Sequence, residues 1–284
     1  MKIILSRKGF DSSAGGYPSP ILPDGSLLSL PIPDEKDKIK YSELTYKNTN
    51  FFDLMRQLNI NKINLENRKL DLNKNTTCHL DPDIRTNSLK HSEKWKGIFG
   101  QMGSAQTHLD NQNVKEGDLF LFFGWFRKTI HCEDKLIFDC TDKHGKHIIF
   151  GYLEIDQKLT VNNRKDLKQW MLYHSHANRS KIGQNGNTIY ISKEKMSFSS
   201  QNKGYGIFNY NDSLVLTKSG ETRSKWNLPS FFKSKRISYH TNKNWRDNYF
   251  QSAGRGQEFV IEESIDVEKW AQQLILSNLK NDCT

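Results

Sequence analysis

Short apolar runs separated by polar turns dominate the chain, and they predict a fold rich in β-strands. Such runs are typical of strands, whereas a helix places apolar residues three and four positions apart. The predicted strands are residues 1–6, 119–126, 136–140, 147–156, 188–192, 205–210 and 213–217. Asn211 and Asp212 form a candidate tight turn between the last two strands.

Helical spacing of apolar residues occurs in three places. Residues 50–58 have a single apolar face, and Leu167, Trp170 and Met171 mark one face of a second helix. The chain closes with an amphipathic helix that Asp266 can cap. Its apolar stripe consists of Val267, Trp270, Ala271, Leu274 and Ile275.

These elements predict an α+β fold. We expect a single compact domain over residues 1–284, with a bent or barrel-like, mostly antiparallel sheet and the C-terminal amphipathic helix. Neither an internal repeat nor a linker divides the sequence. Residues 59–77 are rich in Asn and Lys, and we expect a surface insert there with a turn or a disordered tip.

Composition adds a preference for anionic partners. The 42 Lys and Arg residues exceed the 32 Asp and Glu residues, giving a net charge of +10. A cationic surplus attracts polyanions such as DNA or a nucleotide, although Lys and Asn are also abundant in proteins from AT-rich genomes. No apolar run reaches the length of a membrane span, and the start lacks a signal-peptide pattern. We therefore expect no membrane partner, a cytoplasmic location, and reduced thiols at Cys78, Cys132, Cys140 and Cys283.

The segment 6–25 has the strongest functional pattern. Arg7 can bind an oxyanion through two hydrogen bonds, Lys8 adds a point charge, and Gly15-Gly16 allows a close backbone approach. Asp11 can act as a base or orient a ribose hydroxyl. Ser6, Ser12 and Ser13 supply hydroxyl groups. The segment matches neither the Walker A loop nor G-x-G-x-x-G. The alternative is a polar turn whose side chains bind their own backbone.

Two further segments are candidate ligand sites. Residues 251–258 place Arg255 between two glycines and Gln257-Glu258 at the start of a strand. A Gln/Glu pair in that position is similar to ADP-ribosyl transfer sites, where the Glu positions the nucleophile; the alternative is a surface hairpin. Residues 217–245 alternate cations and aromatic rings, which suits a nucleic-acid groove or a core beside a cationic rim. Its candidate nucleic-acid-binding residues are Arg223, Lys225, Trp226, Lys235 and Arg236.

Other chemistry is less well supported by the sequence. His174 and His176, with His131-Cys132 upstream, do not have the spacing of a standard zinc site. We read them as partly exposed histidines and expect no metal; no cofactor is indicated. Asp142 and the Asp156-Gln157-Lys158 run imitate a metal-dependent nuclease pattern. Trp125, on the aromatic strand, is a candidate for stacking on a flipped base, as in PUA- and EVE-type readers.

Six segments together resemble a known family. They are SRKGFDSSAGGYPSPILPDG, CHLDPDIR, GQMGSAQTHL, GDLFLFFGWF, RSKWNLP and SAGRGQEF, in that order. The sequence is similar, from residue 1 to about residue 270, to the nucleotide modification associated domain 3 family of phages and bacteria. The resemblance implies a setting in systems that alter DNA bases, with other proteins of such a system as possible partners. It also implies a role for the opening residues Ser6, Arg7, Lys8, Asp11, Gly15 and Gly16.

Three functional hypotheses follow. The first is a nucleotide- or base-modifying enzyme, such as a transferase, that binds a phosphorylated ligand. In it Arg7, Asp11 and Glu258 are catalytic, and the ligand contacts Ser6, Lys8, Ser12, Ser13, Gly15, Gly16, Trp125, Arg255 and Gln257. The second is a non-catalytic reader of modified bases in DNA, and the third is a metal-dependent nuclease that acts on modified DNA.

Overall fold

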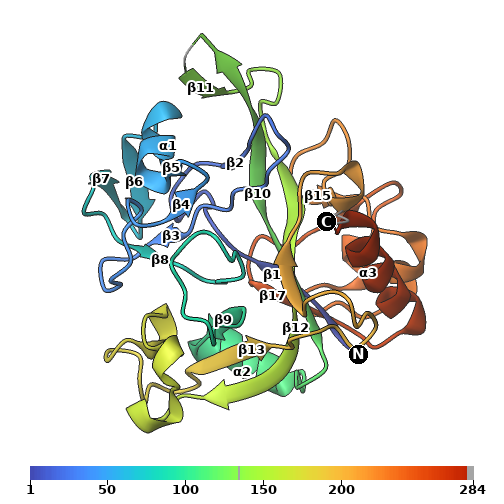
Figure 1. Cartoon of the computed structure of the whole chain (residues 1–284). Coiled ribbons are helices and arrows are strands. Elements are labelled where there is room, and N and C mark those ends of the chain that lie inside the picture. The colour runs from blue at the N-terminus through green and yellow to red at the C-terminus, as the bar shows by residue number, and fades with distance from the viewer. Residues whose placement is uncertain (134, 280–284) are drawn as a thin grey trace.

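A nine-stranded mixed sheet forms the centre of the protein, as the computed structural model of residues 1–133 and 135–279 shows (Figure 1). The α+β prediction is confirmed, and the sheet is bent but not closed into a barrel. The main order is β17 (Glu258–Ile261), β1 (Ile3–Arg7), β10 (Leu119–Cys132), β12 (Lys146–Thr160), β13 (Thr188–Ser192) and β9 (Ile98–Gln101). Three strands pair beside this path: β2 (Ser19–Ile21), β11 (Lys135–Phe138) and β14 (Tyr205–Ile207).

Most pairs are antiparallel, as the sequence predicts. The exceptions are β1 and β2, which both run parallel to β10. The long strands β10 and β12 pair from Leu119 to Phe126, with a register shift between Phe122 and Phe123. The first five residues of β10 are fully buried. Burial on both faces explains why the sequence there is a continuous apolar run without alternation.

Three helices cover the sheet at separate places. α1 (Phe51–Gln57) lies on one side of the β10–β12 pair and α3 (Ile265–Asn278) on the other, whereas α2 (Gly103–Asn111) lies beside β9 and β13 (Figure 1). Asn50 caps α1 by accepting a hydrogen bond from the backbone of Asp53. The predicted apolar stripe of the closing helix is confirmed, but Ser264 and not Asp266 is its N-cap residue.

Short elements complete the described chain. The short strands are β3 (Ile32–Pro33), β4 (Thr45–Tyr46), β5 (Thr49–Asn50), β6 (Lys62–Leu65), β7 (Arg68–Asp71), β8 (Cys78–His79), β15 (Lys225–Trp226) and β16 (Phe250–Gln251). The 3-10 turns are η1 (Arg164–Asp166), η2 (Gln169–Met171), η3 (Ser175–Ala177), η4 (Asp212–Leu214), η5 (Ser230–Ser234) and η6 (Asn242–Asn244).

Two local predictions were wrong. In place of the predicted helix face at residues 167–171, only Gln169–Met171 form a 3-10 turn, because the backbone of Leu167 and Lys168 before it is extended. Residues 213–217 form a 3-10 turn and isolated bridges rather than a strand, since Asn211 accepts a hydrogen bond from the Ser213 backbone. The turn predicted within 59–77 is present, at residues 66–67 between β6 and β7, which form a hairpin that Ile63 anchors in a second hydrophobic cluster with Phe10 and Phe51.

Two expectations about the chain concern its thiols and membrane contact. Cys78, Cys132 and Cys140 are free thiols, while Cys283 lies outside the described residues. Among the helices in the described ranges, none combines the length and apolar character needed to cross a membrane.

Candidate functional site

A cavity of about 530 Å³ opens where the C-terminal end of β1 meets the ends of β9 and β17. Segments far apart in the sequence line it: residues 7–14, the His79–Asp81 segment, the Gln101–Met102 segment and the turn of Gly254, Gly256 and Gln257. Three cations, Arg7, Lys8 and Lys181, face three carboxylates, Asp11, Asp34 and Asp81. The opening segment and the 251–258 segment, predicted separately, therefore meet in one site.

Lys8 and Glu258 form a buried ion pair beneath this cavity. The Lys8 ammonium lies 2.8 Å from the Glu258 carboxylate, and the two side chains are 9% and 0% exposed. Gln101 donates a second hydrogen bond, 2.7 Å long, to the same Glu258 oxygen. Lys8 also lies 4.4 Å from the centre of the Phe99 ring. Glu258 thus holds Lys8 in place, and its carboxylate is turned away from solvent.

Arg7 fixes the 251–258 turn. Its guanidinium donates hydrogen bonds to the carbonyl oxygens of Ala253 (2.6 Å) and Gly254 (3.0 Å). It stacks against the Phe123 and Phe259 rings, and burial lowers its pKa below the usual value. These contacts make Arg7 a positioning residue of the cavity wall, because both terminal nitrogens of its guanidinium already donate to backbone carbonyls, although Nε has no hydrogen-bond partner among the described residues.

The Asp11 turn shapes the opposite wall. One Asp11 carboxylate oxygen accepts hydrogen bonds from the Ser13 and Ala14 backbone and from the Ser13 hydroxyl, each 2.7 Å long. This is the self-bonded polar turn that the sequence left as an alternative. Gly16 donates to the Asp11 carbonyl, and Gly15 pairs with Asn64 of the hairpin.

Replacement of Gly15 tests how much the turn depends on its backbone. Gly15 has a φ of +84°, and a Cβ there would lie 2.2 Å from the buried Phe10 ring. We expect Gly15→Ala to lower the free energy of unfolding by about 2 kcal/mol, from left-handed backbone strain and overpacking. Gly25→Ala is the control, since it has a similar φ of +83° and open space at the Cβ position. Urea unfolding of both variants separates the cost of the contact with Phe10 from the cost of the backbone strain. Equal losses of unfolding free energy in the two variants would contradict a contribution from this contact.

The remaining residues of the ligand prediction lie in different surroundings. Gln257 is exposed at the cavity and Arg255 is exposed on the adjoining turn, whereas Ser6 is fully buried in β1. Ser12 is exposed, and its hydroxyl accepts a hydrogen bond from Arg223 (3.1 Å). Trp125 is half-buried, donates to the His144 carbonyl, and has the Arg223 guanidinium 4.0 Å from its ring centre.

The predicted nucleic-acid run is not one surface. Trp226 is 1% exposed and packs between Phe123, Phe250 and Phe259, so it belongs to the core. Lys225 pairs with Glu221 at 2.8 Å. Lys235 and Arg236 line a separate hollow of about 340 Å³. The Arg223 guanidinium does not line this hollow and lies over the Trp125 ring instead.

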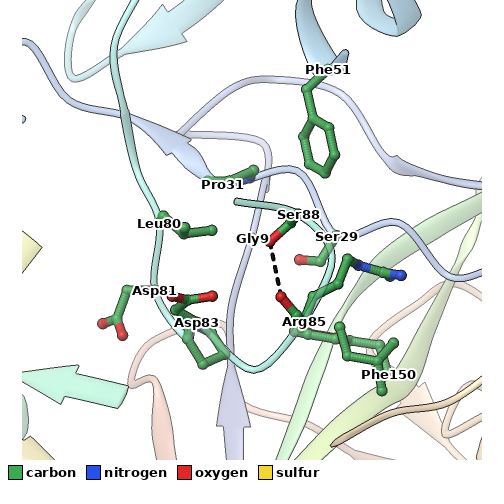
Figure 2. Close-up of a pocket in the computed structure, with 12 residues that line it drawn as sticks. Gly9, Ser29, Pro31, Phe51, Leu80, Asp81, Asp83, Arg85, Ser88 and Phe150 are labelled. Carbon is green, nitrogen blue, oxygen red and sulfur yellow. Dashed lines mark hydrogen bonds between the residues drawn. The ribbon is translucent and has the colours of Figure 1, made fainter. Parts of the chain in front are cut away.

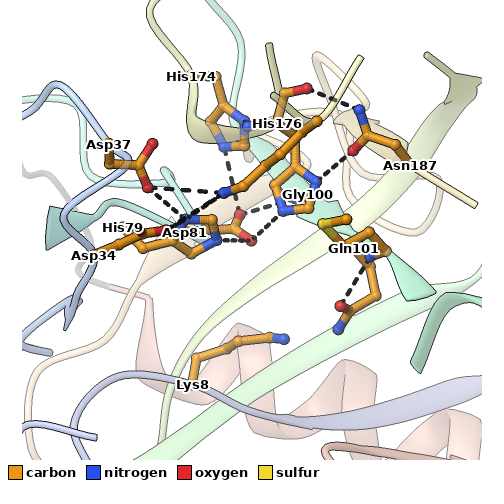
Figure 3. Close-up of polar contacts among 12 residues, drawn as sticks. Lys8, Asp34, Asp37, His79, Asp81, Gly100, Gln101, His174, His176 and Asn187 are labelled. Atoms are coloured by element: carbon orange, nitrogen blue, oxygen red, sulfur yellow. Dashed lines mark hydrogen bonds and ion pairs between the residues drawn. The ribbon is translucent and has the colours of Figure 1, made fainter. Parts of the chain in front are cut away.

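A cluster of histidines and aspartates forms the far wall of the cavity (Figure 3). The Nε2 atoms of His79 and His176 each lie 3.7 Å from Asp81 Oδ2. His174 Nε2 lies 3.4 Å from the other Asp81 oxygen. The expectation of partly exposed histidines was wrong at 174 and 176, which are 0% and 3% exposed. His131 and Cys132 are exposed on β10 and take no part.

The His176 ring has a fixed orientation. Asn187 donates through its amide nitrogen to the His176 carbonyl (3.0 Å), so its amide oxygen faces His176 Nδ1 at 2.7 Å. Nδ1 must therefore carry the hydrogen. Burial lowers the pKa of His176 to about 3, which leaves a lone pair on Nε2 at neutral pH. Gly100 leaves room for the ring, because a Cβ there would lie 2.2 Å from it.

His79 and Asp81 are oriented in the same way. His79 Nδ1 lies 2.7 Å from Asp37 Oδ2, and Asp81 Oδ1 accepts a hydrogen bond from the Gly100 backbone (2.8 Å). Lys181 Nζ also lies 3.1 Å from His79 Nδ1. The contact with Asp37 is the shorter of the two, and an ionised carboxylate can only accept a hydrogen bond. We therefore assign the hydrogen to His79 Nδ1, which donates it to Asp37. Burial lowers the pKa of His79, but the hydrogen bond to Asp37 and the nearby negative charge of Asp81 outweigh it and raise the pKa above its usual value.

The segment that carries Asp81 is packed tightly on its other side. Asp81 and Asp83 lie together at one edge of a hollow between this segment, Gly9 and Ser29 (Figure 2). The hollow has a volume of about 30 Å³. That volume suits one water molecule, so this hollow is no ligand site. Ser88 donates to the Arg85 carbonyl across it (3.1 Å).

The nuclease pattern is not assembled. Asp142 precedes the start of β12, pairs with Lys146 and accepts a hydrogen bond from the Lys128 backbone. Asp156 lies toward the other end of this 15-residue strand. Lys158 pairs with Asp110 at 2.6 Å. The two carboxylates therefore cannot share one ion.

Sequence reasoning missed four members of the cavity cluster: Asp37, His79, Asp81 and Lys181. A signal was present, because His79 and Asp81 alternate in CHLDPDIR just as His174 and His176 alternate in their own segment. Residues two apart in an extended chain project to one side; in the structure His174 and His176 lie at the 3-10 turn η3 and both still approach Asp81, so the two segments face each other. Neither the His79/Asp81 pair nor the His174/His176 pair indicates a site by itself. A site forms because the fold brings the two pairs together.

Comparison with known proteins gives one match. The family model for nucleotide modification associated domain 3 matches residues 2–262. No curated protein and no solved structure matches the chain. The family match covers most of the sequence, including every segment that lines the cavity. The chain therefore belongs to the nucleotide modification associated domain 3 family.

Proposed function

We propose that this protein is an enzyme of a DNA base or nucleotide modification system, and that it binds a phosphorylated nucleotide in the cavity at the end of β1. One observation carries the proposal. Arg7, from the opening motif, donates to Gly254, 247 residues further along the chain, and both line the same cavity. Its volume of about 530 Å³ is in the range of small-molecule sites.

The lining residues supply both binding and reactive groups. Lys181, 13% exposed, Lys8 and the exposed amide of Gln257 can donate hydrogen bonds to phosphate oxygens. His79, Asp81 and His176 bring two imidazole rings and a carboxylate together at the far wall, a set of groups that a binding module does not require. Arg7, Asp11 and Glu258 hold the walls in place.

Nucleotide binding tests the proposal directly. We expect the wild type to bind at least one deoxynucleoside mono- or triphosphate, and Lys181→Met to weaken that binding roughly 10-fold or more, because a charge-assisted hydrogen bond is lost. Lys225→Met is the matched control, since Lys225 pairs with Glu221 outside the cavity. Isothermal titration calorimetry measures the affinity. Equal affinity in both variants, or no binding by the wild type, would refute the site.

Nucleoside mass spectrometry tests the reaction class. We expect DNA or nucleotide pools from cells that express the wild type to contain an altered nucleoside that is absent with Asp81→Asn. If Trp125→Ala instead abolishes a preference for modified DNA, with no altered nucleoside, the protein is a reader.

A further inference from the structure

We propose that His79, Asp81 and His176 form a binding site for one divalent transition-metal ion at the wall of the cavity. This goes beyond the proposed nucleotide site and departs from the sequence expectation of no metal. The three ligand atoms, two imidazole Nε2 atoms and one carboxylate oxygen, all lie within 4.8 Å of one another. Two histidines and one carboxylate are a common set for Zn²⁺ and Fe²⁺ with open positions.

The contacts within this set favour a cation between its members. Each Nε2 atom lies 3.7 Å from Asp81 Oδ2, which is too long for a hydrogen bond. Ligands bound to one tetrahedral ion lie about 3.4 Å apart. Because Nδ1 donates to Asn187, the neutral His176 ring has its lone pair on Nε2. Its lone pair therefore faces a carboxylate oxygen, an arrangement that repels unless a cation lies between them.

Hydrogen bonds from neighbouring residues orient the three ligand side chains, as they do around known metal sites. His79 donates through Nδ1 to Asp37 (2.7 Å) and His176 through Nδ1 to Asn187 (2.7 Å). Such bonds direct Nε2 at the metal and strengthen it as a ligand. The Gly100 backbone holds Asp81 Oδ1, which leaves Oδ2 for the ion.

An independent observation comes from His174. Its Nε2 atom is fully buried, has no hydrogen-bond partner among the described residues, and lies 3.4 Å from Asp81 Oδ1. An unpartnered ring nitrogen directed at the same carboxylate is costly in a structural cluster. Beside a metal site it becomes an outer contact that restrains Asp81.

A metal would change the charge of the cavity. The lining contains three cationic and three carboxylate side chains, so their charges cancel. A divalent ion adds two positive charges, and with three protein ligands it keeps coordination positions open toward the cavity. Those positions face the region where a phosphate or water oxygen would bind.

Titration with the metal alone tests the site. Full-length protein is stripped with a chelator, dialysed, and titrated with Zn²⁺ and with Co²⁺, whose visible absorption reports coordination geometry. We expect one ion per chain, at least 100-fold weaker binding in His176→Ala, and roughly 10- to 100-fold weaker binding in Asn187→Ala, which removes only the outer contact. His131→Ala, an exposed histidine outside the cluster, should bind as the wild type does.

The wild-type titration decides the matter even if a variant fails to fold. Absence of one tight site on the wild type shows a metal-free cluster of charged residues and overturns the proposal. Equal loss in His131→Ala, or unchanged affinity in folded His176→Ala, overturns it as well. Nucleotide titrations with and without the metal keep the two proposals distinguishable, because metal binding is measured in the absence of nucleotide.

Discussion

Lys8→Met is expected to lower the free energy of unfolding by about 3–5 kcal/mol, the usual cost of leaving a buried charge unpaired. Glu258 is 0% exposed, and Lys8 is its ion-pair partner at 2.8 Å. Its second oxygen has no hydrogen-bond partner among the described residues. Without Lys8, the carboxylate retains only the Gln101 amide. Urea unfolding monitored by circular dichroism gives the difference.

Removing Lys8 and removing the charge of Glu258 should lower the stability by different amounts. This difference separates an effect of charge from an effect of packing. Glu258→Gln leaves the Lys8 ammonium able to reach water in the cavity, so it should cost less than Lys8→Met. The double variant Lys8→Met/Glu258→Gln should recover most of the loss. Lys47→Met is the control: its pair with Asp24 is 65% and 39% exposed, and such pairs contribute about 0–1 kcal/mol. A double variant as unstable as Lys8→Met would assign the loss to packing.

The secondary structure of the long apolar stretches was predictable, because their local sequence pattern requires the burial that the fold gives them. The run from Leu119 to Phe126 can only be buried, and its strand is confirmed, although it continues to Cys132. The closing helix is confirmed for the same reason. Residues 213–217 differ, because Val215 meets the sheet through a single bridge to Ile148. A few apolar residues do not fix a strand without a neighbouring partner.

The site was only partly predictable, since its chemistry depends on which segments meet. The sequence identified the opening segment and the 251–258 turn, and the structure brings both to one cavity. The sequence did not show that the Arg7 guanidinium would donate its hydrogen bonds to the backbone carbonyls of Ala253 and Gly254. Nor did it show that His176 would be buried, because most of its neighbours between His174 and Arg179 are polar. Burial of a polar side chain follows from distant partners such as Asn187.

The aromatic residues show the same limit. Trp226 and Trp125 both lie beside cations in the sequence, yet one is in the core and the other is half-buried beneath Arg223. Alternating rings and cations fit a groove and a core rim equally well. Only the packing of Phe123 and Phe259 against Trp226 distinguishes the two.

Acidification should destabilise the protein through His147, which lies in the core away from the cavity cluster. Burial, together with the nearby charges of Arg7 and Arg223, lowers the pKa of His147 well below its ordinary value. Its Nδ1 accepts a hydrogen bond from Trp226 Nε1 (3.1 Å), which protonation would break. Below about pH 6.5 the unfolded chain binds a proton at this residue and the folded chain does not, so stability falls as pH falls.

The expected loss from His147 is about 1.4 kcal/mol for each pH unit below about 6.5, or about 2.7 kcal/mol at about pH 4.5. His147→Gln keeps an acceptor for Trp226 but does not titrate. Its unfolding free energy should therefore depend less steeply on pH by that amount, whatever the substitution costs at neutral pH. His144→Gln, at an exposed position, should keep the wild-type slope. Parallel pH profiles for wild type and His147→Gln would show that His147 binds its proton equally well in the folded and unfolded chain, and the Trp226 contact would then have to be reassigned.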